Sequence, residues 1–243
     1  MQQILKILLA GDTHGALDDL AKKAIEIQPD FILQVGDLGI FSSYENMDSK
    51  TKKHYRHDKN ISQIFPYIRK EKEFPIPLYF IRGNHEEYGL LPDLDLPNIH
   101  YLKSGLHIIN SIRIGTLGGI YYLGKNEQKA KMDKYTQPQE YWHVLKEAKD
   151  GVDILLTHDS PKGALPHLIR YSHGSPFVSK LVKRLKPSLL IHGHYHYPTE
   201  VYIFEETKVI YLGYRDTYIL KYEINNIEKN NENEPIIFTG PIS

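Results

Sequence analysis

The chain has 243 residues, of which 41% are hydrophobic and 25% charged, as is typical of a soluble globular protein built from one or two domains. Its 30 basic and 30 acidic residues balance, so the overall charge does not indicate a nucleic-acid or membrane binder. Cysteine is absent, which excludes disulfides and thiolate metal sites and leaves His, Asp, Glu and Asn as metal ligands.

The first half of the chain predicts alternating strands and helices. Residues 4–10 form a short apolar run that suits a buried strand, and residues 16–28 carry apolar side chains at helical spacing. Strands are expected again at 31–35 and 76–81, with a helix at 61–72 between them. This order is typical of a parallel sheet covered on both faces. The polar residues 42–60 are expected to form a loop or lid.

The second half of the chain predicts shorter elements and no linker long enough to divide it. Because no internal repeat is present either, we expect a single domain over residues 1–224 and a polar tail over 225–243. The predicted elements are hairpins between 99 and 123, a helix at 138–149, a strand at 152–157, a helix at 175–186, a strand at 188–191 and short strands at 199–224.

Neither a membrane span nor a signal peptide is predicted. No apolar run approaches the ~20 residues that a spanning helix requires. The run at 4–10 is too short for a signal peptide, and no cleavage region follows it. A cytoplasmic protein is therefore expected.

Polar side chains suited to metal binding follow directly after five of the predicted strands. Ligands in open α/β sheets bind at the carboxyl ends of the strands, so we expect these side chains to share one rim. The five segments are GDTHG at 11–15, GDLG at 36–39, RGNHE at 82–86, THDSP at 157–161 and HGHYH at 192–196.

Each segment alone also has a plain structural interpretation. Asp12 can be a helix cap beside an unrelated histidine, and a Gly-Asp pair after a strand is often a turn. The alternating His192, His194 and His196 would lie on one face of an extended chain, roughly 6.6–7 Å apart, either as ligands or as core residues. Five such segments, each after a core strand, favour a metal centre over coincidence.

Together the five motifs resemble the calcineurin-like metallophosphoesterases, whose pattern is D-x-H, G-D, G-N-H-[DE], H and G-H-x-H. The resemblance implies an α/β fold, a four-layer αββα sandwich of two mixed β-sheets flanked by helices. In motif order the chain is most similar to the lariat-debranching-like branch. Debranching enzymes typically carry cysteine where this chain has Asp12, so the resemblance favours the ordinary two-metal pattern over debranching.

By this resemblance the cofactors are two divalent metal ions, with Mn favoured over Fe, Ni or Zn. Two such ions bring a charge of +4, and two aspartates return −2; the remaining positive charge attracts phosphate and lowers the pKa of bound water. The resemblance assigns Asp12, His14, Asp37 and His196 to one ion, and Asp37, Asn84, His158 and His194 to the other, with Asp37 bridging.

His85 is the catalytic residue that the resemblance implies, because a histidine can protonate a leaving oxygen at neutral pH. Protein phosphatases place an acidic partner for this histidine and a phosphate-binding arginine shortly after the second motif. Here that stretch is Leu38-Gly39-Ile40-Phe41, which supplies neither and does not favour a protein phosphatase.

Further residues are expected around the ligands. Glu86, Asp159 and His192 are expected to support them, with a core role favoured for His192. The basic run at 50–59 and His173 are candidate substrate contacts, although both can equally be solvated surface. Within the basic run the candidates are Lys52, Lys53 and Arg56.

The implied function is a dinuclear metal-dependent phosphoesterase that hydrolyses phosphoester bonds by a metal-bound hydroxide, with a phosphodiesterase favoured. One alternative is a phosphomonoesterase (phosphatase) with the same two-metal site. Another, of a different class, is a non-catalytic scaffold of this fold. The expected partner is a phosphoester substrate. A nucleic acid is indicated only by the basic run, a membrane is not indicated, and no residue pattern predicts the oligomeric state.

Overall fold

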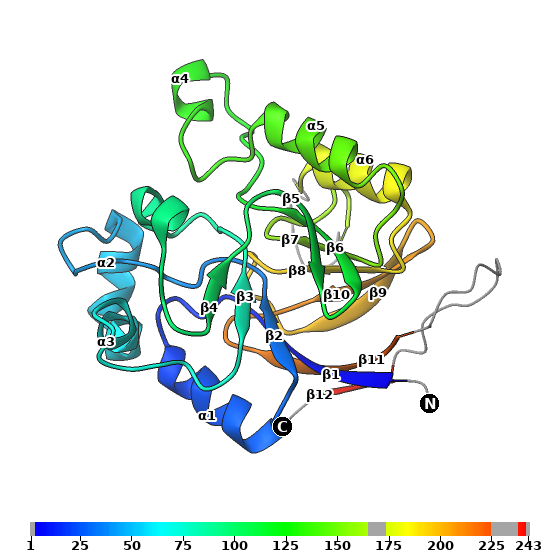
Figure 1. The fold of residues 1–243 in the computed structure, drawn as a ribbon. Helices are drawn as coiled ribbons and strands as arrows, with labels where there is room; N and C mark the ends of the chain where they lie inside the picture. The colour runs from blue at the N-terminus through cyan, green and yellow to red at the C-terminus, as the bar shows by residue number, and fades with distance from the viewer. Residues whose placement is uncertain (1–2, 165–173, 225–237, 242–243) are drawn as a thin grey trace.

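A computed structural model describes residues 3–164, 174–224 and 238–241, and in this part of the chain the strands form two six-stranded sheets (Figure 1). The first sheet has the order β12 (Phe238–Pro241), β11 (Thr217–Ile224), β1 (Gln3–Ala10), β2 (Phe31–Gln34), β3 (Leu78–Phe80) and β4 (Ile99–Tyr101). The second has the order β5 (Gly105–Ile109), β6 (Ile112–Leu117), β7 (Ile154–Thr157), β8 (Leu189–His192), β10 (Thr207–Tyr211) and β9 (Glu200–Phe204).

Both sheets are mixed, as predicted. β1 pairs parallel with β2 and antiparallel with β11, and β2, β3 and β4 continue in parallel. In the second sheet β6, β7, β8 and β10 run parallel, and the antiparallel strands β5 and β9 form its two edges. The carboxyl ends of β1, β2 and β3 therefore meet at one edge of their sheet, and those of β7 and β8 meet at one edge of theirs.

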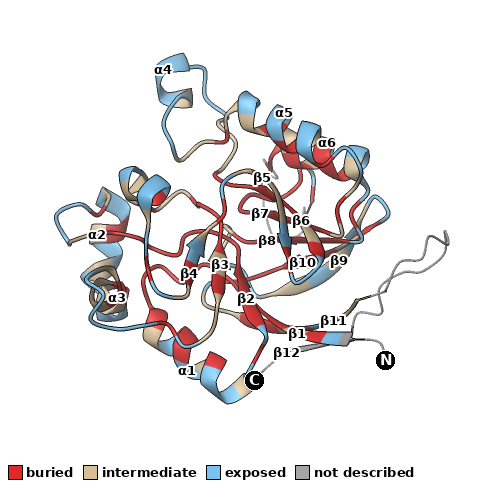
Figure 2. Ribbon diagram, in the orientation of Figure 1, coloured by how far each residue is buried: buried red, intermediate tan, exposed pale blue. Residues whose placement is uncertain are grey.

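Helices cover the outer face of each sheet, so the predicted four-layer αββα sandwich is confirmed. The alternation along β1 shows the two sides: Leu5, Ile7 and Leu9 pack between the sheets, while Leu8 and Ala10 pack beneath helices. The first sheet is covered by α1 (Leu17–Ile27) and α3 (Ile64–Ile68), and the second by α5 (Pro138–Glu147) and α6 (Pro176–Leu185). Figure 2 shows the central strands β2, β7 and β8 as buried and the outward faces of the helices as exposed.

The segment predicted as a loop, 42–60, contains a short helix. α2 (Ser49–Tyr55) begins at Asp48, whose side chain accepts hydrogen bonds from the backbone N–H groups of Lys50 and Thr51. A 3₁₀ helix, η1 (Lys59–Gln63), follows and begins in the same way at Asp58. These capped turns have little apolar periodicity, so hydrophobic patterning does not predict them.

Three further short elements complete the described structure. They are η2 (Tyr88–Asp93), α4 (Glu127–Ala130) in the polar stretch before α5, and β12, which lies within the predicted tail and pairs with β11. The domain boundary at residue 224 stays a prediction. No helix in the described residues combines the length and the apolar character that crossing a membrane requires.

Candidate metal centre

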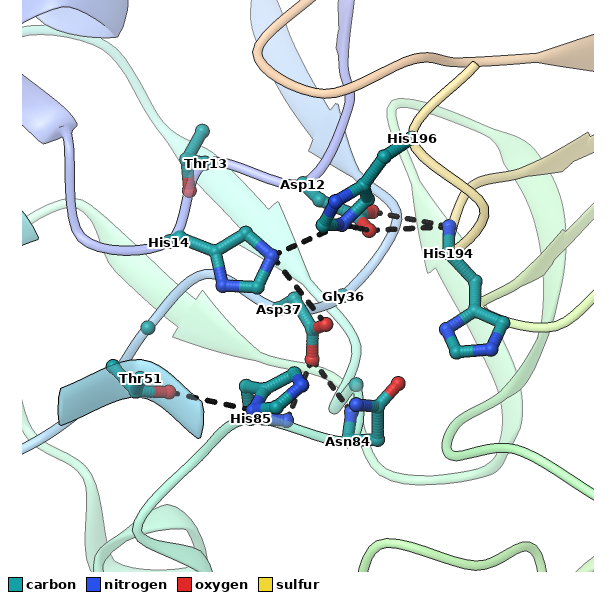
Figure 3. Close-up of polar contacts among 12 residues, drawn as sticks. Asp12, Thr13, His14, Gly36, Asp37, Thr51, Asn84, His85, His194 and His196 are labelled. Carbon is teal, nitrogen blue, oxygen red and sulfur yellow. Dashed lines mark hydrogen bonds and ion pairs between the residues drawn. The ribbon is translucent and has the colours of Figure 1, made fainter. Parts of the chain in front are cut away.

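The five sequence motifs come together where the carboxyl ends of β1, β2, β3, β7 and β8 meet. Asp12, Asp37 and Asn84 follow strands of the first sheet, whereas His158 and His194 follow strands of the second. Figure 3 shows side chains from these strand ends pointing toward one another. The centre thus lies between the two sheets, and its side chains come from the loops that follow the strands.

One group of donor atoms is formed by Asp12, His14, Asp37 and His196, whose ligand atoms all lie within 4.8 Å of one another. His196 Nε2 lies 3.1 Å from Asp12 Oδ2 and 3.2 Å from His14 Nε2. His14 Nε2 lies 3.7 Å from Asp37 Oδ2. The first three residues are buried, whereas the side chain of His196 is 38% exposed. The group is therefore open to solvent at His196.

Asp37 also lies beside Asn84 and His158, and the His194 ring packs against the His158 ring. His158 Nε2 lies 3.5 Å from Asp37 Oδ2 and 3.1 Å from Asn84 Oδ1. The His194 ring lies edge-on to the His158 ring, with 5.0 Å between their centroids. His158 Nδ1 donates to the carbonyl oxygen of Val35 at 2.9 Å. That hydrogen bond orients the ring so that Nε2 faces Asp37 and Asn84.

The backbone is strained at four of the predicted ligands. His14, Asp37, His194 and His196 have φ angles of 46°, 52°, 82° and 57°, in the left-handed region that residues other than glycine rarely adopt. Such strain is of order 1–3 kcal/mol per residue and concentrates at functional sites. The extended conformation assumed for residues 192–198 is wrong, because β8 ends at His192. His194 and His196 reach the centre from turns, not from alternation along a strand.

Glycines next to two of the ligands allow the motifs to approach closely. A Cβ atom on Gly83 would collide with the side chain and backbone nitrogen of Asp37, and one on Gly193 would collide with the carboxylate of Asp12. Each glycine therefore lets the loop after one strand lie directly against a carboxylate from another strand.

The electrostatics of the centre suit a bound cation. Burial acts to raise the pKa of Asp37, but the neighbouring His158 and His14 outweigh it and hold that pKa well below the ordinary value. Burial acts to lower the pKa of His158, but Asp37 and Asp12 raise it to about 10. Positive charge on His158 therefore balances the buried carboxylates. Divalent ions would supply the same balance, so the donor set fits hard or borderline metal ions.

The segment that follows Asp37 is bonded to successive residues of the RGNHE motif. Asp37 Oδ1 accepts the backbone N–H groups of Asn84 and His85 at 2.6 and 2.7 Å. The buried carboxylate of Glu86 accepts the N–H groups of Leu38, Gly39 and Ile40. Burial and the Asp37 carboxylate raise the pKa of Glu86, while these backbone donors act in the opposite direction. Glu86 thus holds the loop that carries Asp37.

The acidic partner of His85, which the sequence did not reveal, is Asp48. His85 Nδ1 donates to Asp48 Oδ2 at 2.8 Å, and Thr51 Oγ1 donates to the same oxygen at 2.6 Å. Burial acts to lower the pKa of His85, but Asp48 and Asp37 raise it above its ordinary value. The only sequence signal for Asp48 is its position as a helix cap, three residues before Thr51.

We expect Asp48→Asn to lower kcat about 10-fold, by analogy with the 10–100-fold span seen when a residue that orients a metal-binding side chain is changed. Asparagine also caps helices, so α2 should persist. Loss of the charge should lower the pKa of His85, which must be protonated to act as an acid. The alkaline limb of the pH–rate profile should therefore move to lower pH, with metal content unchanged. An unshifted profile, or a further rate loss when the substitution is added to His85→Ala, would contradict this pairing.

His192 and Asp159 lie behind the centre. His192 is buried at the end of β8, with Nε2 at 2.8 Å from the hydroxyl of Tyr202, and burial lowers its pKa to about 3. Asp159 accepts hydrogen bonds from the backbone of Tyr121 and from the hydroxyl of Tyr195, which stands between His194 and His196. Asp159 thus holds the turn that carries these two histidines.

His192→Ala is expected to lower the free energy of unfolding by about 2–5 kcal/mol, as for other large buried side chains, and to leave both metal ions in place. Urea denaturation and metal analysis measure the two effects separately. Equal metal loss in His192→Ala and His194→Ala would show instead that His192 is a ligand.

Three of the candidate substrate contacts, Lys52, Lys53 and Arg56, lie in α2 or directly at its end. Lys52 Nζ donates to the carbonyl oxygen of Glu45 at 2.6 Å, so it is held against the preceding loop. Lys53 and Arg56 are exposed at the end of α2. His173 lies outside the described residues.

The fold, the centre and a match to a protein-family model together define the class of this protein. A family model for calcineurin-like phosphoesterase matches residues 5–198, and the chain belongs to that family. Among curated proteins, the lariat debranching enzyme of Gallus gallus is 28% identical across 84% of this chain and 45% of its own length. The lariat debranching enzyme of Homo sapiens is 27% identical across 79% and 42%. The chain spans less than half the length of both relatives.

Solved structures share the fold at low sequence identity. A protein from Thermus thermophilus, TT1561, superposes with a TM-score of 0.57 over 90% of this chain and 94% of its own, at 17% identity. A dimetal phosphatase from Danio rerio superposes with a TM-score of 0.55 over 98% and 99%, at 12% identity. At these identities the likeness concerns the fold alone.

Proposed function

We propose that this chain is a dinuclear metal-dependent phosphodiesterase. The observation that carries the proposal is the position of Asp37, whose Oδ2 lies 3.7 Å from His14 Nε2 and 3.5 Å from His158 Nε2. One carboxylate that serves two adjacent groups is what a pair of metal ions ~3.5–4 Å apart requires.

The proposal assigns a metal-binding or a proton-donating role to each residue. Asp12, His14, Asp37 and His196 would hold one divalent ion, and Asp37, Asn84, His158 and His194 the other, with Mn²⁺ favoured. Such ions, when bound, activate water and stabilise charge on phosphoryl oxygens. His85 is held through Nδ1 by Asp48, which leaves Nε2 to donate a proton to the departing ester oxygen.

The names of the curated relatives favour a diester over a monoester. Debranching cleaves a link between two parts of a chain, and a phosphate that joins two parts is a diester. Debranching itself is not proposed, because Asp12 stands where those enzymes typically carry cysteine. A scaffold without catalysis is not favoured either, because the group of Asp12, His14, Asp37 and His196, the neighbouring His158 and Asn84, and His85 with its Asp48 partner are all present.

The experiment compares turnover of bis-p-nitrophenyl phosphate, a diester, with that of p-nitrophenyl phosphate, a monoester, by protein reconstituted with Mn²⁺, Fe²⁺, Ni²⁺ or Zn²⁺. We expect the diester to be the better substrate by kcat/KM. A preference for the monoester would establish the phosphatase alternative. Turnover of neither ester with any of these ions would favour the scaffold.

A further inference from the structure

The first donor group, formed by Asp12, His14, Asp37 and His196, draws its ligands from two different sheets. Asp12 follows β1 of the first sheet, whereas His196 follows β8 of the second. The two side chains nevertheless meet, with 3.1 Å between His196 Nε2 and Asp12 Oδ2 (Figure 3). Strand pairing does not set this distance, because β1 and β8 share no sheet. Contacts between the loops that follow these strands must set it instead.

The β10–β11 loop, residues 212–216, connects the ends of these two strands. Tyr211, the last residue of β10, is paired with His192 at the end of β8. Thr217, the first residue of β11, is paired with Ala10 at the end of β1. The chain therefore crosses from the second sheet to the first directly beside both ligand-bearing strand ends.

On the Asp12 side, the β10–β11 loop is bonded through its backbone. The N–H of Gly11 donates to the carbonyl oxygen of Asp216 at 2.9 Å, and the N–H of Arg215 donates to that of Asp12 at 3.1 Å. A Cβ atom on Gly11 would collide with the carbonyl oxygen of Gly213. The loop thus lies directly against the residues that place Asp12.

On the His196 side, the same loop is bonded through the Asp216 carboxylate. Asp216 Oδ2 accepts the backbone N–H of Thr199 at 3.1 Å and the Thr199 hydroxyl at 2.7 Å. The hydroxyl oxygen in turn accepts the N–H of Gly213 at 3.0 Å. Thr199 follows His196 by three residues, in the connection between β8 and β9. Asp216 is therefore bonded to the loop after β1 by its backbone and to the loop after β8 by its side chain.

Two tyrosines support the same region in other ways. The Tyr211 hydroxyl accepts the N–H of Tyr197 at 2.6 Å and donates to its carbonyl oxygen at 3.1 Å. Tyr211 comes from the second sheet, as His196 does, so this contact does not link the two sheets. The Tyr214 ring, from the β10–β11 loop, packs against the rings of His14 and His196, with centroids 5.5 and 5.0 Å apart. Ring packing is less directional than the pair of hydrogen bonds at Asp216.

We propose that Asp216 is a positioning residue that holds His196 within reach of the metal ion bound by Asp12. The inference rests on the proposed function and adds a residue to its first metal site. Ligands keep their geometry when hydrogen bonds from surrounding residues hold them, and loss of such support weakens metal binding. His196 is the ligand of this group that is open to solvent, so it depends most on the connection that follows it.

The experiment titrates the metal-free full chain with Mn²⁺ by calorimetry, which gives a dissociation constant for each ion. The constant that is lost in His196→Ala belongs to the first donor group. Asp216→Ala removes the bonds to Thr199 and keeps the backbone oxygen that Gly11 contacts. Asp216→Asn keeps a carbonyl oxygen as acceptor and removes only the charge.

Asp153→Ala is the matched control. Asp153 is also a partly buried carboxylate that accepts a backbone N–H, that of Arg113 at 2.7 Å. It immediately precedes β7, whose other end leads to the metal centre. Urea unfolding of each metal-free variant, measured in parallel, separates an effect on metal binding from an effect on stability.

For Asp216→Ala we expect Mn²⁺ to bind the first donor group ~10-fold more weakly, at the lower end of the 10–100-fold span for residues that support ligands. The other ion should keep its affinity. Asp216→Asn should recover most of the loss, and Asp153→Ala should leave both constants at the parental level.

Three results would overturn the inference. Parental constants for both ions in Asp216→Ala, with only the urea midpoint lowered, would make Asp216 merely structural. Equal losses in Asp216→Ala and Asp216→Asn would assign the effect to charge. If Asp216→Ala does not fold, Thr199→Val removes the hydroxyl donor with little change of shape and should weaken the same ion; parental affinity there would be the third.

Failure of this inference and failure of the proposed function give different results. If the parent binds two ions and turns over neither ester, while Asp216→Ala weakens one ion, the proposed phosphodiesterase fails and the role of Asp216 stands. If the parent hydrolyses the diester and Asp216→Ala binds both ions as tightly, the function stands and the inference fails. A parent that binds fewer than two ions would overturn both.

Discussion

Asp37→Asn is expected to abolish hydrolysis and to lower the metal content of both sites. The asparagine oxygen can still accept the N–H groups of Asn84 and His85, so the loop should keep its shape. The amide nitrogen of asparagine would then take the place of Oδ2, the oxygen that faces His14 and His158. An amide nitrogen has no lone pair to offer to a metal ion. We expect metal affinity to fall by more than ~10²-fold, beyond the 10–100-fold seen when only an orienting partner is changed.

Asp30→Asn provides the matched control. Asp30 immediately precedes β2, whose other end leads to Asp37, and its carboxylate accepts the backbone N–H of Lys6. The same chemical change there should leave both ions in place. Elemental analysis after dialysis gives the readout, and two tightly bound ions in Asp37→Asn would refute the shared carboxylate.

His85→Ala is expected to retain both metal ions and to lower kcat by ~10²–10⁴-fold, the usual span for loss of a general acid. The side chain donates to Asp48 through Nδ1, and Asp37 accepts only the backbone N–H of His85, which alanine keeps. The donor groups should therefore be undisturbed while the proton source is lost.

The leaving group distinguishes the two roles open to His85. A nitrophenolate needs no proton to depart, whereas an alkoxide does, so the rate loss should be smaller for aryl than for alkyl phosphodiesters. Equal losses for both series, measured as log kcat against leaving-group pKa, would assign His85 to stabilising charge on the phosphoryl group instead.

The strands and the rim they create could be predicted because buried strands have a strong local signature. Residues 4–10 and 31–35 are mainly apolar runs, each followed by glycine and aspartate, and the observed β1 and β2 begin and end within a residue of these limits. The motifs that follow the strands were also predicted to meet, since parallel strands deliver their carboxyl ends to one edge.

The remaining parts depend on contacts between segments distant in sequence. Asp48 was not identified because its role requires α2 to pack beside His85, 37 residues later in the chain. α2 itself has mostly polar side chains and begins at a cap, so the hydrophobic pattern does not show it. The turns at His194 and His196 were missed because alternate histidines in a sequence resemble a strand, and positive φ angles have no signature there.

The left-handed backbone at His14, Asp37, His194 and His196 has a consequence for the lifetime of the protein in a cell. Each such residue costs of order 1–3 kcal/mol, against a net stability of about 5–15 kcal/mol for a typical domain. A ligand that binds only the folded chain restores about 4.1 kcal/mol at a thousand times its dissociation constant. When divalent metal is scarce, more chains should open and reach proteases, so the abundance of this protein should follow the supply of its ions.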